Sequence, residues 1–312
     1  MATNNKRVAI VGSGLIGRAW ASVFAGGGYE VALFDSVPGA AETARGLVAE
    51  GLSELAEHGL VSDAKAAAQR VRAARDLADA LAGVGHVQEN TPETVETKRA
   101  IFAELDRLAA PAAILASSTS TIVASLFTEP LRGRHRCLVA HPVNPPHLVP
   151  VVELVGAPWT AAETIAAAKA TYEAVGQVPI VVKKEIDGFI LNRLQAVLLS
   201  EAFRLVEDGY VTPQDLDKTI KDGLGLRWSF MGPFETIELN APGGTPDYCA
   251  RYGASLSRLS GADPAIYQGG PLARLLALWG ETPSAAQIAS RMHWRDRRLA
   301  ALKTHKRTQP AQ

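Results

Sequence analysis

The feature that most constrains the fold of this chain is a glycine pattern close to its start. Arg7–Val11 is a short, nearly continuous apolar run, which is typical of a strand buried on both faces. It leads directly into Gly12-Ser13-Gly14-Leu15-Ile16-Gly17, which has the spacing G-x-G-x-x-G and opens a segment with helical periodicity over 15–25. Glycines at this spacing also occur by chance. Strand, loop and helix in this order nevertheless predict the first βαβ unit of a dinucleotide-binding domain, with a pyrophosphate at the helix N-terminus.

An acidic residue at the end of the next expected strand refines this prediction. Asp35 follows the strand Glu30–Phe34, where a carboxylate can accept hydrogen bonds from the adenosine ribose. It would repel a 2′-phosphate, and Ser36 and Val37 supply no arginine to neutralise one. The sequence therefore favours NAD over NADP. The alternative is that the glycines form an ordinary tight turn and that Asp35 caps the following helix.

Strand-like and helix-like segments alternate up to about residue 186. Further strands are expected over Val84–Gln88, Ile114–Ser117, Cys137–His141, Val151–Val155 and Ile180–Lys183. Helices are expected over 39–58, 93–109 and 161–176. This alternation predicts an α/β domain with a doubly wound, mostly parallel sheet of Rossmann type over residues 1–186.

The pattern changes near Glu185. Residues 188–208 form one long helical stretch with apolar residues nearly all round, which predicts a central or interface helix. Later helices are expected over Pro213–Asp222, Pro233–Leu239, Leu272–Leu278 and Ala285–Leu302. No later strand pattern is convincing, so we expect an all-α domain over 187–312 that binds substrate and dimerises. The polar tail His305–Gln312 is expected to be disordered.

Composition excludes several functional classes. The 32 basic and 32 acidic residues balance, which disfavours a general attraction to nucleic acid or anionic membrane. Cys137 and Cys249 are far apart in the sequence, so neither a disulfide scaffold nor a cysteine zinc site is expected, and we expect no metal. The N-terminus lacks a signal-peptide pattern and no apolar run is long enough to span a bilayer, which predicts a cytoplasmic protein.

Polar residues gather between the strands of the second half of this domain. Hydroxyl side chains follow the strand 114–117 at residues 117–121, where doubly wound folds bind ligands or where they cap the next helix. His141 ends its strand and enters a proline-rich loop, a position that suits a general base but also a structural histidine. Glu153 interrupts an apolar strand and is either the buried partner of His141 or a solvent-facing carboxylate at an edge.

These motifs together resemble the 3-hydroxyacyl-CoA dehydrogenase family, and within it the lambda-crystallin and L-gulonate 3-dehydrogenase branch. The matching segments are VAIVGSGLIGRAWA, QENTPETVETKRAIF, ASSTST, VAHPVNPPHLVPVVELV, DGFILNRLQ and GLGLRWSFMGPFETIELNA. They keep their order and spacing from residue 8 to about 241. The last 60 or so residues match weakly. By this resemblance the chain is an NAD-dependent dehydrogenase and a homodimer.

The resemblance also implies roles for single residues. It makes His141 the general base and Glu153 its carboxylate partner, with Ser120 and Asn192 binding the reacting oxygen of the substrate. It places Glu89 and Lys98 near the ribose and nicotinamide of NAD, with Asn144 beside the cofactor or in a structural role. In this reading a hydride leaves C3 of the substrate for the nicotinamide while His141 takes the hydroxyl proton.

Arg227 bears on the choice of substrate. It resembles an arginine of the branch that handles free hydroxy acids, where a guanidinium could clamp a carboxylate. It could instead be a surface residue or form an interdomain ion pair. The first hypothesis is a dehydrogenase of small L-3-hydroxy acids such as L-gulonate, 3-hydroxybutyrate or carnitine. The alternatives are a 3-hydroxyacyl-CoA dehydrogenase and a non-catalytic, crystallin-like NAD-binding protein. His147 departs from the aromatic residue expected in gulonate dehydrogenases and leaves the substrate open.

Overall fold

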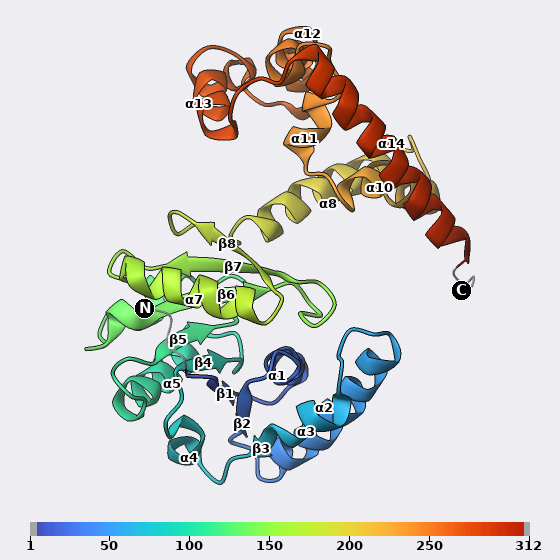
Figure 1. Cartoon of the computed structure of the whole chain (residues 1–312). Coiled ribbons are helices and arrows are strands. Elements are labelled where there is room, and N and C mark those ends of the chain that lie inside the picture. Colours follow the sequence, from blue (N-terminus) through green and yellow to red (C-terminus); the bar gives the residue numbers. More distant parts are fainter. Residues whose placement is uncertain (1–4, 309–312) are drawn as a thin grey trace. The chain divides into compact units, whose positions relative to one another are not determined.

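The computed structural model describes residues 5–308 and divides into two compact units between Leu199 and Ser200. The first unit is a sheet with helices on both faces (Figure 1). The second is built of helices, with no strand among its described residues 200–308. These two architectures confirm the predicted fold class. The division falls inside helix α8 (Leu191–Glu207), beyond the expected boundary near residue 186.

The sheet of the first unit has eight strands in the order β3-β2-β1-β4-β5-β6-β7-β8. Their bounds are β1 Arg7–Val11, β2 Glu30–Phe34, β3 Val71–Ala73, β4 His86–Glu89, β5 Ile114–Ser117, β6 Cys137–Pro142, β7 Val151–Gly156 and β8 Val178–Val182. All neighbouring strands are parallel except β6 and β7, which are antiparallel. Strands β2 and β3 extend the sheet to one side of β1, and β4 to β8 extend it to the other side. The carboxyl ends of β1 and β4 therefore border the position at which doubly wound folds bind ligands.

The helices of this unit cover both faces of the sheet. They are α1 Leu15–Gly26, α2 Ala40–Glu57, α3 Ala64–Gln69, α4 Leu77–Leu81, α5 Val95–Leu108, α6 Ser125–Thr128 and α7 Ala162–Ala174. Several begin at a side-chain cap: Asp63, Asp76 and Thr94 each accept a hydrogen bond from a backbone N–H in the first turn. Sequence periodicity alone did not predict the short elements α3, β3 and α4.

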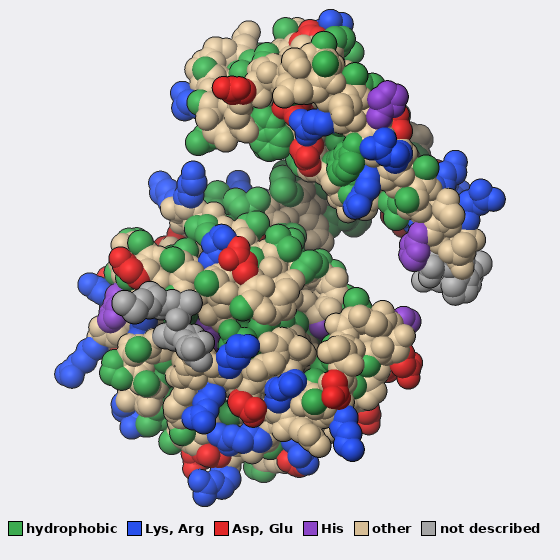
Figure 2. Space-filling view, in the orientation of Figure 1, with side chains coloured by type: hydrophobic (Ala, Val, Ile, Leu, Met, Phe, Trp, Pro, Cys, Tyr) green, Lys and Arg blue, Asp and Glu red, His purple; other side chains and the backbone are tan. Residues whose placement is uncertain are grey.

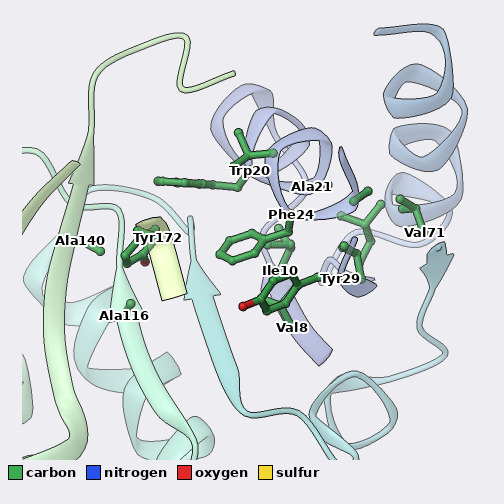
Figure 3. Close-up of a cluster of buried hydrophobic side chains, with 14 of the residues drawn as sticks. Val8, Ile10, Trp20, Ala21, Phe24, Tyr29, Val71, Ala116, Ala140 and Tyr172 are labelled. Atoms are coloured by element: carbon green, nitrogen blue, oxygen red, sulfur yellow. The ribbon is translucent and has the colours of Figure 1, made fainter. Parts of the chain in front are cut away.

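Alternate residues of each strand supply two separate cores. Val8 and Ile10 of β1 lie in the cluster that packs under α1, α2 and α7, shown in Figure 3 around Trp20, Phe24 and Tyr172. Their neighbours on the strand face the opposite cluster, which includes α5 and α6. This alternation follows from the two-residue period of a strand and explains why apolar residues occur on both faces of most strands. The same alternation places each polar residue of β4, β6 and β7 on one or the other of the two faces of the sheet.

The second unit contains six helices besides the end of α8, together with a π-helical stretch and a 3₁₀ turn, within its described residues. They are α9 Pro213–Lys218, the π-helix Thr219–Leu224, α10 Gly225–Trp228, α11 Pro233–Glu238, α12 Gly244–Ser260, the 3₁₀ turn Pro264–Tyr267, α13 Gly269–Trp279 and α14 Ala285–Thr308. Helix α12 was not predicted, because its glycines and Pro246 disfavour a helix. Pro246 lies in the first turn, where proline is tolerated. Gly253 packs so closely on Tyr267 that a Cβ would lie 2.7 Å from that side chain.

The structure decides one alternative for the long helix and corrects the expectation for the tail. Helix α8 has no buried residue within this chain, so it is not a central core helix. Leu194, Val197 and Phe203 are largely exposed, and the alternative of an interface helix stays a prediction. The tail is not disordered from His305, because α14 continues through Thr308; residues 309–312 lie outside the described part of the chain. None of the helices within residues 5–308 combines the length and apolarity needed to cross a membrane. Positive and negative side chains are interspersed over the visible surface of the sheet unit (Figure 2).

Candidate active site

The glycine loop has the shape that a dinucleotide requires. A Cβ on Gly12 would lie 2.7 Å from the carbonyl oxygen of Asn90, and a Cβ on Gly17 would lie 2.0 Å from the carbonyl oxygen of Gly12. Gly14, by contrast, faces open space. Two glycines therefore allow close packing of the loop, whereas the third leaves room for a ligand. Helix α1 begins at Leu15 with no side-chain cap, so its first N–H groups can bind a pyrophosphate.

Asp35 lies beside this loop and helps to hold it. Its Oδ2 accepts hydrogen bonds from the backbone N–H and the hydroxyl of Ser13, at 2.7 and 2.8 Å. Its Oδ1 accepts from the N–H of Val37 at 3.0 Å. Burial raises the pKa of Asp35, but these hydrogen bonds outweigh burial, so the pKa is lowered and the carboxylate is charged at neutral pH.

A cavity of about 780 Å³ adjoins these residues. Its lining includes Gly12, Gly14, Asp35, Val37 and Ile101. The open glycine, the uncapped helix and the charged carboxylate lie on one cavity, as the phosphates and ribose of NAD require. These residues fit the cofactor, and the aspartate is poorly suited to a 2′-phosphate.

Glu89 and Lys98, which we expected at the cofactor, form an ion pair beneath the surface of the site. Glu89 is fully buried and Lys98 is 1% exposed. The ammonium of Lys98 lies 2.9 and 3.0 Å from the two carboxylate oxygens and also donates to the carbonyl of Thr91. The hydroxyl of Ser117 donates to Glu89 at 2.6 Å. Neither charged group is accessible to a ligand here. The pair instead stabilises the ends of β4 and β5 from the interior of the protein.

Glu93 is a residue of this region that sequence reasoning missed. Its Oε1 accepts hydrogen bonds from the hydroxyl of Thr119 at 2.6 Å and from the N–H groups of Ser120 and Thr121 at 2.8 and 3.1 Å. The side chain is 41% exposed, in contrast to Glu89. A carboxylate shortly after a strand that ends near the glycine loop was the available signal. Glu93 holds the serine loop in place.

Ser120 and Asn192 are brought together although they lie 72 residues apart in the sequence. The side-chain amide of Asn192 donates to the carbonyl oxygen of Ser120 at 2.9 Å. The backbone of Ser120 is thus held at its N–H by Glu93 and at its carbonyl by Asn192. Its hydroxyl has no partner among residues 5–308 and is available to a substrate.

His141 and Glu153 face each other across the antiparallel pair β6–β7. The strand register places them directly opposite, and Nδ1 of His141 lies 2.8 Å from Oε2 of Glu153. Because a carboxylate can only accept, this bond places the proton of a neutral imidazole on Nδ1 and leaves Nε2 free to accept one. Glu153 is fully buried, which excludes the alternative of a solvent-facing carboxylate at an edge.

The second oxygen of Glu153 binds the start of α8. Its Oε1 accepts from the N–H groups of Ile190 and Leu191 at 2.8 and 3.0 Å. Burial raises the pKa of Glu153, but the bonds from His141, Leu191 and Ile190 outweigh it and the pKa is lowered. One charged carboxylate therefore orients His141 and also fixes the helix that carries Asn192 in its first turn.

The two remaining predicted residues, Asn144 and Arg227, belong to different units. Asn144 is exposed in the loop after β6, where it precedes Pro145. Arg227 lies in α10 of the second unit and is partly exposed, and its guanidinium has no ion-pair partner among the described residues 200–308 of that unit. An ion pair inside the second unit therefore does not account for this arginine.

Two family models match the chain. The NAD-binding domain of 3-hydroxyacyl-CoA dehydrogenase matches residues 7–186, and the C-terminal domain of the same enzyme matches 188–272. The chain belongs to the 3-hydroxyacyl-CoA dehydrogenase family. This confirms the resemblance seen in the motifs, and membership of this family assigns NAD as the cofactor.

Individual members of the family extend the match over nearly the whole chain. The lambda-crystallin homolog of Bos taurus is 44% identical over 306 residues, which cover 95% of each protein. The L-carnitine dehydrogenase of a Pseudomonas species is 39% identical over 255 residues, which cover 81% of this chain and 79% of that one. A solved 3-hydroxyacyl-CoA dehydrogenase from Archaeoglobus fulgidus matches with a TM-score of 0.77 at 25% identity, over 97% of this chain and 99% of that one. These matches support the lambda-crystallin branch.

Proposed function

We propose that the protein oxidises the 3-hydroxyl of a small L-3-hydroxy acid of the L-gulonate type to the 3-keto acid. The observation that carries this proposal is the contact between His141 and the fully buried Glu153, whose other oxygen holds the helix of Asn192. A base, its charge partner and an amide from a distant segment meet at one end of the sheet. These are the groups needed to remove the proton from an alcohol while its carbon loses a hydride.

The proposed mechanism assigns one task to each side chain. Nε2 of His141 accepts the hydroxyl proton, and the resulting imidazolium is stabilised by the charge of Glu153. The hydroxyl of Ser120 and the amide of Asn192 bind the oxygen on which negative charge develops as the O–H bond breaks. When bound along the glycine loop and Asp35, NAD supplies the acceptor for the hydride released from C3. A positioned base of this kind contributes about 10²–10⁴ in rate.

Arg227 is our candidate for selection of a free acid. A guanidinium can donate two parallel hydrogen bonds to the two oxygens of a carboxylate. A thioester does not offer such a pair of charged acceptors. We expect Arg227→Met to abolish turnover of free acids. The matched control is Arg258→Met in α12, which removes an exposed arginine and is expected to leave turnover unchanged. Wild-type activity confined to 3-hydroxybutyryl-CoA would instead favour the acyl-CoA alternative and give Arg227 a structural role.

A second cavity is a poor site for the phosphates of a CoA thioester. It has a volume of about 610 Å³ and adjoins His147, in the loop that follows His141. Its charged residues are Arg18 and the three glutamates Glu50, Glu54 and Glu57, accompanied by His58 and His147. Burial lowers the pKa of His147, which favours its neutral form. Carboxylates outnumber permanent cations here, so the cavity suits an uncharged or cationic substrate group better than the phosphates of coenzyme A.

The deciding assay follows NADH formation with L-gulonate, L-3-hydroxybutyrate, L-carnitine and 3-hydroxybutyryl-CoA. We expect turnover of a free acid with NAD and poor turnover with NADP. His141→Gln should remove it. If wild type and His141→Gln are equally inactive on all four substrates while both bind NAD, the non-catalytic, crystallin-like alternative is the better one.

We further propose that the protein is a cytoplasmic homodimer. The exposed apolar side chains of α8, including Leu194, Val197 and Phe203, suit a self-complementary contact of the kind that twofold dimers use. Light scattering on Val197→Glu should then show a monomer where wild type is dimeric. A dimer that persists in this variant would place the contact elsewhere.

A further inference from the structure

The turn that precedes α8 has an unusual backbone. Gly188 has a φ of 72° and Phe189 a φ of 49°, so two consecutive residues adopt the left-handed conformation. Phe189 is the one non-glycine residue with positive φ among residues 5–308. A bulky side chain rarely adopts this conformation, and such strain persists only where the surrounding structure enforces it. It is found most often at functional sites.

The turn directs two backbone N–H groups at one carboxylate oxygen. The N–H groups of Ile190 and Leu191, which follow the left-handed pair, both donate to Oε1 of Glu153. The turn is closed by a bond from the N–H of Phe189 to the carbonyl of Ile186 at 3.2 Å. Without this chain reversal, Glu153 would lose two of its three hydrogen bonds.

The side chain of Phe189 lies against the other partner of Glu153. It is fully buried in the cluster that also contains residues of α5 and α6. Its ring centroid lies 5.5 Å from that of His141, with 49° between the planes. The ring therefore limits rotation of the imidazole and access of water to it, while the backbone of the same residue leads into the N–H groups that hold Glu153.

We propose that Gly188 and Phe189 form a positioning device for the His141–Glu153 pair, with Phe189 as the positioning residue. The inference rests on the proposed function, because it concerns how the general base is held. The strained backbone places the two N–H donors on Glu153, and the ring fixes the imidazole in the plane that this carboxylate can reach. Phe189 itself touches no substrate and exchanges no proton.

The experiment compares three variants. Phe189→Leu keeps apolar bulk at the site but removes the ring from His141. Gly188→Ala keeps the ring but places a Cβ at a φ of 72°, which disfavours the turn. The matched control is Phe102→Leu, which removes a fully buried ring from the same cluster, where that ring packs on Phe127 at 4.7 Å and not on His141.

Two readouts are taken, and one of them does not need activity. The first is kcat for the free acid that wild type oxidises, with KM for NAD. The second is the low-field proton resonance of the His141 Nδ1–H, assigned by its absence in His141→Gln, and its rate of exchange with water. We expect kcat to fall about tenfold or more in Phe189→Leu and Gly188→Ala, with KM for NAD little changed. The Nδ1 proton should exchange faster in both and should stay as in wild type in Phe102→Leu.

The outcomes separate this proposal from the proposed function. If Phe189→Leu and Gly188→Ala match Phe102→Leu in both kcat and proton exchange, the positioning role is wrong. Should Gly188→Ala fail to fold, Phe189→Leu with its control decides by itself. If wild type oxidises none of the hydroxy acids, the proposed function fails, whereas the exchange of the Nδ1 proton still tests the role of Phe189.

Discussion

His86 and His141 are both buried histidines of the same sheet, 3% and 5% exposed, but their neighbours differ. Nε2 of His86 lies 3.1 Å from the hydroxyl of Tyr172 and 3.4 Å from Oε1 of Gln88, both neutral groups. Its Nδ1 has no partner among the described residues. His141 instead contacts the charged carboxylate of Glu153. Burial alone therefore does not produce a base, because the imidazolium also needs a negative charge beside it.

The position along the strand explains the second difference. His86 begins β4 and its ring packs on Phe24 and Tyr172, on the face covered by α1 and α7. His141 lies near the carboxyl end of β6, the end at which doubly wound folds bind ligands. A histidine in the core of this sheet remains neutral, and one at the carboxyl end can exchange protons with a substrate. The following predictions test this contrast, from the largest expected effect to the smallest.

The largest effect is expected for Glu153→Gln. Two backbone N–H groups fix one oxygen position of this side chain, so the amide must place its NH₂ group toward His141. Nδ1 of His141 would then have to accept, which moves the proton to Nε2 and removes the base. We expect kcat/KM to fall about 10²–10⁴-fold with little change in the Kd for NAD. Activity within tenfold of wild type would show that Glu153 does not set the tautomer.

The second prediction contrasts Glu153 with the other fully buried carboxylate of the sheet unit, Glu89, whose charge Lys98 already balances. Lys98→Met leaves that carboxylate buried and unpaired, and should reduce the free energy of unfolding by about 3–5 kcal/mol. The double variant Glu89→Gln with Lys98→Met should recover most of this loss, as measured by denaturant unfolding. A single variant as stable as wild type would mean that water reaches Glu89.

The third prediction concerns the acid stability of the protein. Burial lowers the pKa of His86 from 6.5 to about 4. Between these values the unfolded chain binds a proton that the native protein does not, so stability falls as the pH decreases. The loss should reach about 3 kcal/mol near pH 4.

His86→Met should flatten this dependence between pH 6.5 and 4.5, whereas His293→Gln, on the exposed side of α14, should not. Unfolding free energies measured across this range test the difference. If His86→Met retains the full slope, another group is responsible for it.

The smallest effect is expected for Glu93, the partly exposed carboxylate that holds the serine loop. Glu93→Ala removes the acceptor for the N–H groups of Ser120 and Thr121. We expect about a tenfold loss in kcat, because Asn192 still holds the carbonyl of Ser120. Glu93→Gln retains an acceptor and should be milder. Equal kcat values for Glu93→Ala and wild type would show that Asn192 alone positions Ser120.

Much of the nucleotide half could be predicted because its signals are local. The order of strand, glycine loop, helix and acid lies within residues 7–35 and fixes backbone shape and charge over a short stretch. The pairing of His141 with Glu153 was also accessible, since a carboxylate in an apolar strand needs a partner. Its antiparallel geometry was not, because both strands have the same apolar pattern in either direction.

Other parts escaped sequence reasoning for identifiable reasons. Glu93 and Glu89 are both acidic residues close to one strand end, and only packing shows that one is buried on Lys98 while the other binds the serine loop. The apolar pattern of residues 188–208 predicted a central or an interface helix, and only the structure shows that α8 has no buried residue within this chain. Helix α12 depends on close contact of Gly253 with Tyr267, which no local pattern shows.

The sequence by itself determined a doubly wound domain with a glycine loop, an acid for the ribose and a histidine at a strand end, because each of these is set by neighbouring residues. Only the tertiary structure decided that Glu153 serves His141 with one oxygen and the start of α8 with the other. The second contact joins residues 37 and 38 positions apart and depends on a left-handed backbone at Phe189. A phenylalanine does not favour that conformation by itself, so the packing around it must supply the energy.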